Sequence, residues 1–316
     1  MKLSDRFLKR RGLDHLDEFY EALCSSTFNL HPKTSYPRKK NWWPGDLEEA
    51  YKLTSDYHRQ HWDPLLAERP IEYSVNKYGM RMEGEPFECP DSILFLGCSF
   101  TFGLGRYKEE SWPEIVMKET GMQGFNISCP SASLDTCYRL LNQWLPVTKS
   151  KTVMVLIPPG TRYEMCHKKD VDYYGEHEAC FSSYGAWTLS AYVREGERKL
   201  EVAKFLSMAL FQEIYQKVNM EKNLAAMAHV CQENGARLIV KDHLCIDQQD
   251  YQHLHNRKEI EYKKAHFTAT EEELEWLRYN WEYSARDGYH PTRGWQELCA
   301  KVFIEEMNDG TENKIP

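Results

Sequence analysis

The sequence has no long hydrophobic run and no excess of positive charge. No stretch of its 316 residues approaches the length of a membrane-spanning helix, and the net charge is −8. The N-terminus, MKLSDRFLKRRGL, is broken by charges and lacks the apolar core of a signal peptide. We therefore expect a cytoplasmic protein without a nucleic-acid or membrane partner. The sequence specifies no oligomeric state.

Sequence patterns typical of disulfides, metals and nucleotides are also absent. The ten cysteines include no CxxC pair, so we expect reduced thiols. The histidines, cysteine and aspartates between His243 and His255 have a spacing that matches no familiar zinc site, so we expect no metal. The glycine-rich segment Gly97–Gly105 lacks the Lys-Ser/Thr pair of a P-loop, and residues 103–108 lack the third glycine of a dinucleotide fingerprint. We therefore expect neither a P-loop nor a dinucleotide site in this segment.

The chain divides into an N-terminal extension and a larger main domain. Residues 1–90 predict a mostly helical extension packed on a main domain at 91–310, which carries polar insertions at about 166–197 and 242–283. Asp46 with Glu49 forms a capping-box pattern that predicts a helix through about His61. The basic and aromatic run Arg38–Trp43 favours a solvated loop with its tryptophans on the core over a polyanion site.

Strands and helices alternate along the main domain. We expect strands at Ile93–Leu96, Phe125–Ser128, Thr152–Ile157 and Ala236–Lys241. We expect helices after the capping box Ser111–Glu114, and at Ser133–Leu145, Lys199–Asn234, about Thr270 onward, and Thr292–Met307. This alternation predicts an α/β fold with a parallel sheet and helices on both faces.

A serine lies in a tight turn directly after the first apolar strand. The stretch SILFLGCSFTFGLG ends its hydrophobic run at Gly97, and Ser99 follows two residues later. Open α/β folds bind ligands at the carboxyl ends of their strands, where this turn lies. Ser99 is therefore a candidate nucleophile, although it could equally cap the helix that follows.

A second motif, Asp287-Gly-Tyr-His290-Pro291, precedes the last helix. One short turn lets Asp287 accept the Nδ1 proton of His290, which leaves Nε2 free to act as a base. A serine hydroxyl becomes a useful nucleophile only when a base takes its proton, so the three residues are needed together. The two motifs thus predict a Ser–His–Asp arrangement.

These motifs resemble those of the SGNH (GDSL-type) hydrolases. Residues 97–103 resemble the family's first block, and Asp287–Pro291 resembles its last block. The second and third blocks would fall at 125–133 and 159–162, and the resemblance covers roughly residues 76–307. It implies a flavodoxin-like three-layer α/β/α domain that hydrolyses esters, thioesters or O-acetyl groups without a cofactor.

The resemblance also implies roles for individual residues. Ser99 would be the nucleophile, His290 the base and Asp287 its orienting partner. Cys98 stands where the family has an aspartate, and we expect it to pack in the core. The expected oxyanion- or substrate-binding residues are Ser131, in place of a glycine, Arg162, in place of an asparagine, and Asn126 and Thr101.

Arg162 has two interpretations. Its guanidinium could donate to an oxyanion or hold an anionic substrate group, or it could form a structural ion pair with Glu164. For the whole protein, the first hypothesis is an esterase or deacetylase that acts on a carbohydrate or small acylated metabolite. The alternative is a non-catalytic domain of the same fold that binds a glycan or another ligand in the same cleft.

Overall fold

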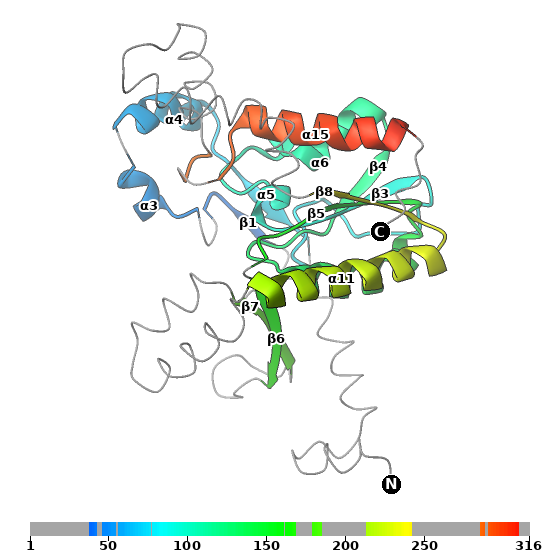
Figure 1. Ribbon diagram of the computed structural model, residues 1–316. Coiled ribbons are helices and arrows are strands. Elements are labelled where there is room, and N and C mark those ends of the chain that lie inside the picture. Colours follow the sequence, from blue (N-terminus) through cyan, green and yellow to red (C-terminus); the bar gives the residue numbers. More distant parts are fainter. Residues whose placement is uncertain are drawn as a thin grey trace, which may run out of the picture.

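The computed structural model describes residues 38–42, 46–54, 56–76, 78–160, 162–168, 179–184, 213–241, 285–287 and 290–309. The described main domain is built on a parallel sheet with the strand order β4-β3-β5-β8 (Figure 1). The first of these strands in the chain therefore lies between the second and the third, as in flavodoxin-like folds. The strands are β3 (Ser92–Leu96), β4 (Gln123–Asn126), β5 (Thr152–Leu156) and β8 (Arg237–Lys241).

Helices cover both faces of the sheet, which confirms the predicted three-layer α/β/α class (Figure 1). One face packs against α7 and α11, and the other packs against α6 and α15. These helices are α6 (Trp112–Thr120), α7 (Leu134–Thr148), α11 (Glu213–Glu233) and α15 (Arg293–Asn308). The expected helix residues 199–212, and the helix expected from Thr270, lie outside the described part of the chain.

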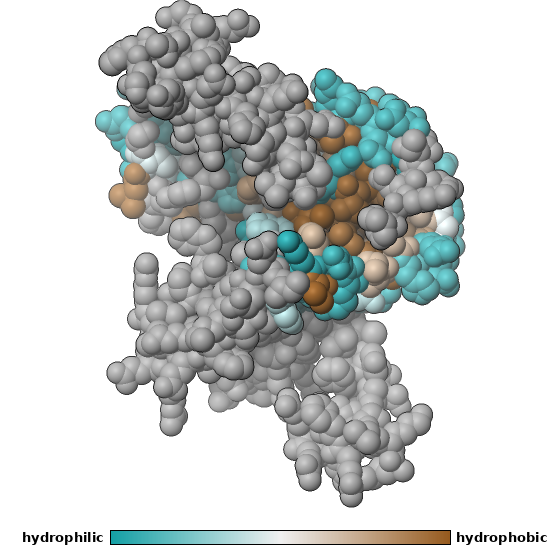
Figure 2. All heavy atoms as spheres, in the orientation of Figure 1, coloured by the Kyte–Doolittle hydropathy of each residue, from teal (hydrophilic) through white to brown (hydrophobic). Residues whose placement is uncertain are grey.

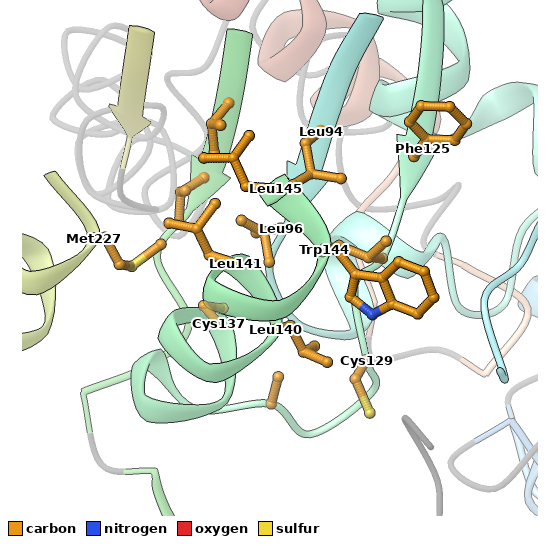
Figure 3. Packing of buried hydrophobic residues seen from close by; sticks show 14 of the residues in the cluster. Leu94, Leu96, Phe125, Cys129, Cys137, Leu140, Leu141, Trp144, Leu145 and Met227 are labelled. Atoms are coloured by element: carbon orange, nitrogen blue, oxygen red, sulfur yellow. The ribbon is translucent and has the colours of Figure 1, made fainter. Parts of the chain in front are cut away.

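Strand β3 is buried throughout because its two faces pack in two different hydrophobic cores. Leu94 and Leu96 point toward α7 and α11, whereas Ile93 and Phe95 point toward α6 and α15. Figure 3 shows the first of these cores, with Leu140 and Leu141 and their neighbours on α7 packed against the sheet. A strand that is buried on both faces has a nearly continuous hydrophobic sequence, which is why this strand could be predicted.

Strand β8 ends the described sheet and is only half-buried. Among its residues Ile239 is fully buried, while Leu238 and Val240 are partly exposed. Figure 2 shows hydrophobic atoms gathered in this region, between α11 and α15. Of the described helices, none is long and apolar enough to span a bilayer.

The capping box predicted at Ser111 does not form. The Ser111 hydroxyl donates to the carbonyl of Lys108 at 2.7 Å and makes no cap hydrogen bond. The Asp46 carboxylate, which was also predicted to cap a helix, accepts hydrogen bonds from Tyr73 and Arg286 inside the protein. The single helix expected through His61 is also wrong, because α3 (Glu48–Lys52) ends before a separate helix, α4 (Asp56–Glu68), begins.

An N-terminal layer packs on the chain segment that follows Ser99. It consists of α3, α4 and the antiparallel pair β1 (Arg38–Lys40) and β2 (Tyr73–Val75), so the basic run is a strand and not a loop. Its buried cluster includes Trp62 and Tyr73 and extends to Phe102 and Leu104. Trp42 packs partly against this cluster, and Trp43 lies outside the described residues.

The two insertions are described only in part. The antiparallel pair β6 (Tyr163–Lys168) and β7 (Ala179–Tyr184) falls largely within the first insertion. The second insertion, including the histidine and cysteine cluster between His243 and His255, lies outside the described residues. Elsewhere in the described chain, no group of histidine, cysteine and acidic side chains could hold a metal ion.

Candidate active site

Ser99 is the first residue of a short helix, α5 (Ser99–Phe102), at the carboxyl end of β3. The turn that carries it requires a glycine at position 97. Gly97 has a φ of +156°, and a Cβ there would lie 2.1 Å from Thr101 Oγ1 and 3.0 Å from the carbonyl oxygen of Leu156. The chain therefore turns within two residues and delivers Ser99, 5% exposed, to the edge of the sheet.

His290 contacts both Ser99 and Asp287. Its Nε2 lies 2.8 Å from Ser99 Oγ, and its Nδ1 makes a close hydrogen bond with Asp287 Oδ2. The second oxygen, Asp287 Oδ1, accepts the backbone N–H of His290 at 3.1 Å. A carboxylate can only accept, so Nδ1 carries the proton and Nε2 is left to accept from the serine hydroxyl. This is the hydrogen-bond pattern of a nucleophile, a base and an orienting acid.

The ring of His290 is confined by its surroundings. The Phe100 ring meets it edge-on, with the centroids 5.6 Å apart. The Asp287 side chain is 1% exposed and that of His290 is 16% exposed. Because water has little access to the carboxylate, its hydrogen bond with the imidazole faces weak competition.

The Asp287 loop is held from two directions. Arg286 donates its backbone N–H to the carbonyl of Gly105 at 2.9 Å, and its carbonyl contacts His58 Nε2 at 2.9 Å. Its buried guanidinium pairs with Asp46 and donates to the carbonyl of Asn41 at 2.7 Å. A side chain on Gly105 would meet Ala285 at 2.8 Å. The N-terminal layer thus fixes the residue immediately before Asp287.

The sequence did not predict that the ion pair between Arg286 and Asp46 holds the Asp287 loop. Arg286 and Asp46 lie 240 positions apart, and neither belongs to a recognisable motif. A charged residue directly beside the expected acid was the only available signal. Surface charges next to catalytic motifs are common, so that signal does not identify a buried ion pair.

Asn126 and Thr101, two of the predicted substrate-binding residues, lie buried in the scaffold behind the serine turn. Asn126 is buried at the end of β4, where its Nδ2 donates to the carbonyl of Thr101 at 2.9 Å and its Oδ1 accepts the N–H of Ser128 at 3.2 Å. The Thr101 side chain is fully buried and lies in the space over Gly97. Both residues connect the serine turn to the neighbouring strand.

Ser131 lies in the loop beside the serine turn. The base of this loop is tied to that turn because the Cys129 N–H donates to the carbonyl of Gly97 at 3.2 Å. Ser131 is exposed and has a φ of +67°, a left-handed conformation that glycine adopts most easily. No described residue accepts the backbone N–H of Ser131 or of Ser99. Ser131 thus has the backbone conformation that a glycine would adopt in this turn.

Arg162 reaches the same loop and does not pair with Glu164. Its Nη1 lies 3.5 Å from the carbonyl oxygen of Ala132, next to Ser131. Glu164 is instead held by Arg139, with distances of 2.7 and 2.8 Å to Nε and Nη2. Of the two interpretations of Arg162, the structural ion pair with Glu164 is therefore wrong, because Arg139 on α7 binds that carboxylate.

Cys98 packs in the core as expected. It is fully buried in the cluster under α7 and forms no disulfide, which is also true of Cys89, Cys129, Cys137, Cys231 and Cys299. The thiol thus packs in the core between the sheet and α7.

The chain is similar in structure to GDSL-type hydrolases. TesA shares 14% identity over 69% of this chain and 98% of that protein, with a TM-score of 0.36. A lipolytic protein of the G-D-S-L family from Desulfitobacterium hafniense shares 13% sequence identity, with a TM-score of 0.34. The match covers 67% of this chain and 99% of that protein. The esterase EstA from Pseudoalteromonas sp. shares 13% sequence identity, with a TM-score of 0.31. The match covers 70% of this chain and 100% of that protein. No family model and no curated protein matches the chain. Similarity at this level supports no statement about activity or substrate, which must come from the site itself.

Proposed function

We propose that this protein is a serine hydrolase of the SGNH type that cleaves esters of a carbohydrate or a small acylated metabolite. The observation that carries the proposal is the continuous hydrogen-bonded chain from Asp287 through His290 to Ser99. The three side chains come from two segments that are 191 positions apart, so local structure alone does not bring them together.

Each residue has a distinct chemical role in this proposal. His290 Nε2 takes the hydroxyl proton as Ser99 Oγ attacks the ester carbonyl, and Asp287 stabilises the imidazolium that forms. His290 then returns the proton to the leaving alcohol, which leaves an acyl group on Ser99. A water molecule, deprotonated by the same imidazole, releases the acid and restores the serine.

The oxyanion of the tetrahedral intermediate needs fixed donors. We assign this role to the backbone N–H groups of Ser99 and Ser131, which no described residue uses. Arg162 adds positive charge beside the Ser131 loop. A guanidinium there would partly replace the asparagine amide that the family places after its third strand. Preorganised donors of this kind contribute about 3–4 kcal/mol each to lowering a barrier.

Hydrolysis of p-nitrophenyl acetate tests the proposal. We expect turnover by the wild type and a loss of at least about a thousandfold in kcat/KM for both Ser99→Ala and His290→Ala, because triad members act as a unit. Ser111→Ala is the matched control, since it removes another buried serine hydroxyl that lies outside the site. Equal activity in the wild type and Ser99→Ala would contradict the hydrolase and favour a ligand-binding domain of the same fold.

A further inference from the structure

The short helix α5, which begins with Ser99, is held by three buried side chains from outside the helix. A helix of one turn cannot satisfy its last carbonyls itself. The successive carbonyls of residues 100–102 accept hydrogen bonds from the side chains of Gln296, Asn126 and Arg81, at 3.1, 2.9 and 3.1 Å. Contacts with distant parts of the chain therefore fix the helix that carries the serine.

Gln296 differs from the other two side chains because it belongs to the helix that follows His290. It lies in α15, one turn after the N-cap Thr292, and is 1% exposed. The other two side chains come from β4 and from the segment before β3. Figure 1 shows α5 close to the N-terminal part of α15. The hydrogen bond from Gln296 to the Phe100 carbonyl thus joins the segment of His290 to the helix of Ser99.

Phe100 is in contact with both sides of the proposed site. It follows Ser99 directly, so a shift of its backbone moves the serine. Its ring packs edge-on against His290, with the ring centroids 5.6 Å apart, and edge-on against Trp295 at 5.5 Å. A displacement of Phe100 would therefore change the position of the hydroxyl and the packing of the imidazole together.

The other end of the Gln296 amide fixes the orientation of the side chain. Its Oε1 accepts the backbone N–H of Trp112, the first residue of α6, at 2.8 Å. Ser111, the N-cap of α6, makes no cap hydrogen bond. A backbone N–H only donates and a carbonyl only accepts, so one orientation of the amide satisfies both Trp112 and Phe100.

We propose that Gln296 is a positioning residue that sets the contact between Ser99 Oγ and His290 Nε2. Both of its side-chain hydrogen bonds go to backbone groups of neighbouring helices and not to the reacting atoms. Its kinetic consequence rests on the proposed hydrolase function, whereas the contact itself, 2.8 Å in the structure, is measurable without turnover. Loss of the amide should lower kcat and leave KM nearly unchanged, because it disturbs the alignment of the reacting groups.

Kinetics of Gln296→Met with p-nitrophenyl acetate give the first test. Methionine is an unbranched side chain that fills the space of glutamine and makes neither hydrogen bond. We expect kcat to fall about tenfold to a hundredfold and KM to stay within about twofold, since a misplacement of about 1 Å costs up to about a hundredfold in rate.

The matched control is Arg237→Met, which removes two hydrogen bonds to backbone at the other end of the same helix. Arg237 donates to the carbonyls of Glu306 and Met307, at 2.6 and 2.8 Å. We expect this variant to have a lower Tm and the kcat of the wild type. The control therefore separates a loss of stability from a loss of alignment.

Nitrogen-15 NMR of histidine-labelled protein measures the contact directly. The Nε2 signal of His290, assigned by its loss in His290→Ala, depends on the hydrogen bond with Ser99. Ser99→Ala gives the position of this signal without the bond. In Gln296→Met the signal should move toward that position, and in Arg237→Met it should stay at the wild-type position. This measurement needs no esterase activity, so it decides the role of Gln296 even where the hydrolase proposal fails.

Gln296→Glu separates the contact with α5 from the contact with α6. A carboxyl oxygen accepts the Trp112 N–H in either protonation state, whereas only the protonated form donates to the Phe100 carbonyl. The kcat of this variant relative to the wild type should therefore fall between about pH 6 and about pH 9, a range in which a buried carboxyl titrates. Circular dichroism at each pH checks that the chain is folded. A residue that only caps α6 predicts a ratio that does not change with pH.

Three results would overturn the proposal. The first is an unchanged kcat with an unmoved Nε2 signal in folded Gln296→Met. The second is an equal fall in kcat for Gln296→Met and Arg237→Met, because the effect would then be one of stability. If Gln296→Met does not fold, the pH profile of Gln296→Glu decides in its place, and a flat ratio is the third.

Discussion

Removing Asp46 should destabilise the protein by several kcal/mol and disturb a site to which Asp46 contributes no reacting atom. The Asp46 side chain is fully buried and that of Arg286 is 1% exposed. Arg286 Nε lies 3.1 Å from Asp46 Oδ1, and its guanidinium lies 3.7 Å from the centre of the Trp42 ring. Without the carboxylate, the guanidinium keeps its charge in a site that water hardly reaches.

The expected magnitude follows from this burial. Breaking a buried ion pair by removing one partner costs about 3–5 kcal/mol, because an uncompensated charge stays behind. The total unfolding free energy of a native protein is about 5–15 kcal/mol, so Asp46→Ala should remove a large share of the stability. Urea denaturation of Asp46→Ala, Arg286→Ala and the double variant measures this loss and the coupling between the two residues.

We expect a coupling energy of about 2 kcal/mol or more between Asp46 and Arg286. The matched pair is Lys39 and Glu72, which lie 2.7 Å apart in the same layer with exposed side chains and should couple by less than about 1 kcal/mol. Additive effects at Asp46 and Arg286 would refute the reasoning. Activity gives a second readout: folded Arg286→Ala should lose up to about a hundredfold in kcat, because Asp287 is no longer held in place. Full activity in that variant would refute the positioning role.

Two further predictions concern Arg162 and the buried thiols. Arg162→Ala should lower kcat for p-nitrophenyl acetate at least about tenfold through loss of charge beside the Ser131 loop, and an unchanged kcat with a lower Tm would make the arginine structural. Burial raises the pKa of Cys129 and Cys231 to about 12, so at pH 8 almost no thiolate is present. Iodoacetamide should therefore modify these two thiols only after denaturation, as mass spectrometry of the peptides would show, and rapid labelling of the native protein would contradict their burial.

The elements that were predicted correctly are those with a clear local sequence pattern, such as an apolar run or an N-cap residue. Strands β3 and β5 are continuous apolar runs, and α7 begins one residue after Ser133, its N-cap. Strand β4 lies two residues earlier than expected, at Gln123–Asn126, because its pairing starts with Gln123 opposite Ser92. The polar and glycine residues of that strand obscured its beginning.

The errors share a physical cause, which is a partner that lies far away in the sequence. The carboxylate of Asp46, predicted only as a helix cap, binds Arg286, which lies 240 positions later. Glu164 does not pair with Arg162 because Arg139 on α7 binds it with two hydrogen bonds. The contact between Ser99 and His290 could be predicted from the sequence. Ser99 follows a predicted strand and His290 precedes a predicted helix, and both positions lie at the same sheet edge. Charged pairs carry no such positional signal.

Covalent labelling with a fluorophosphonate probe tests the central claim most directly. Such probes phosphonylate a serine only when a base activates it, so the account predicts one adduct on the peptide that carries Ser99. Ser99→Ala should show no adduct there, and His290→Ala should label far more slowly than the wild type. A wild-type protein that stays unlabelled, or an adduct of equal yield in Ser99→Ala, would contradict the claim that Asp287 and His290 activate Ser99.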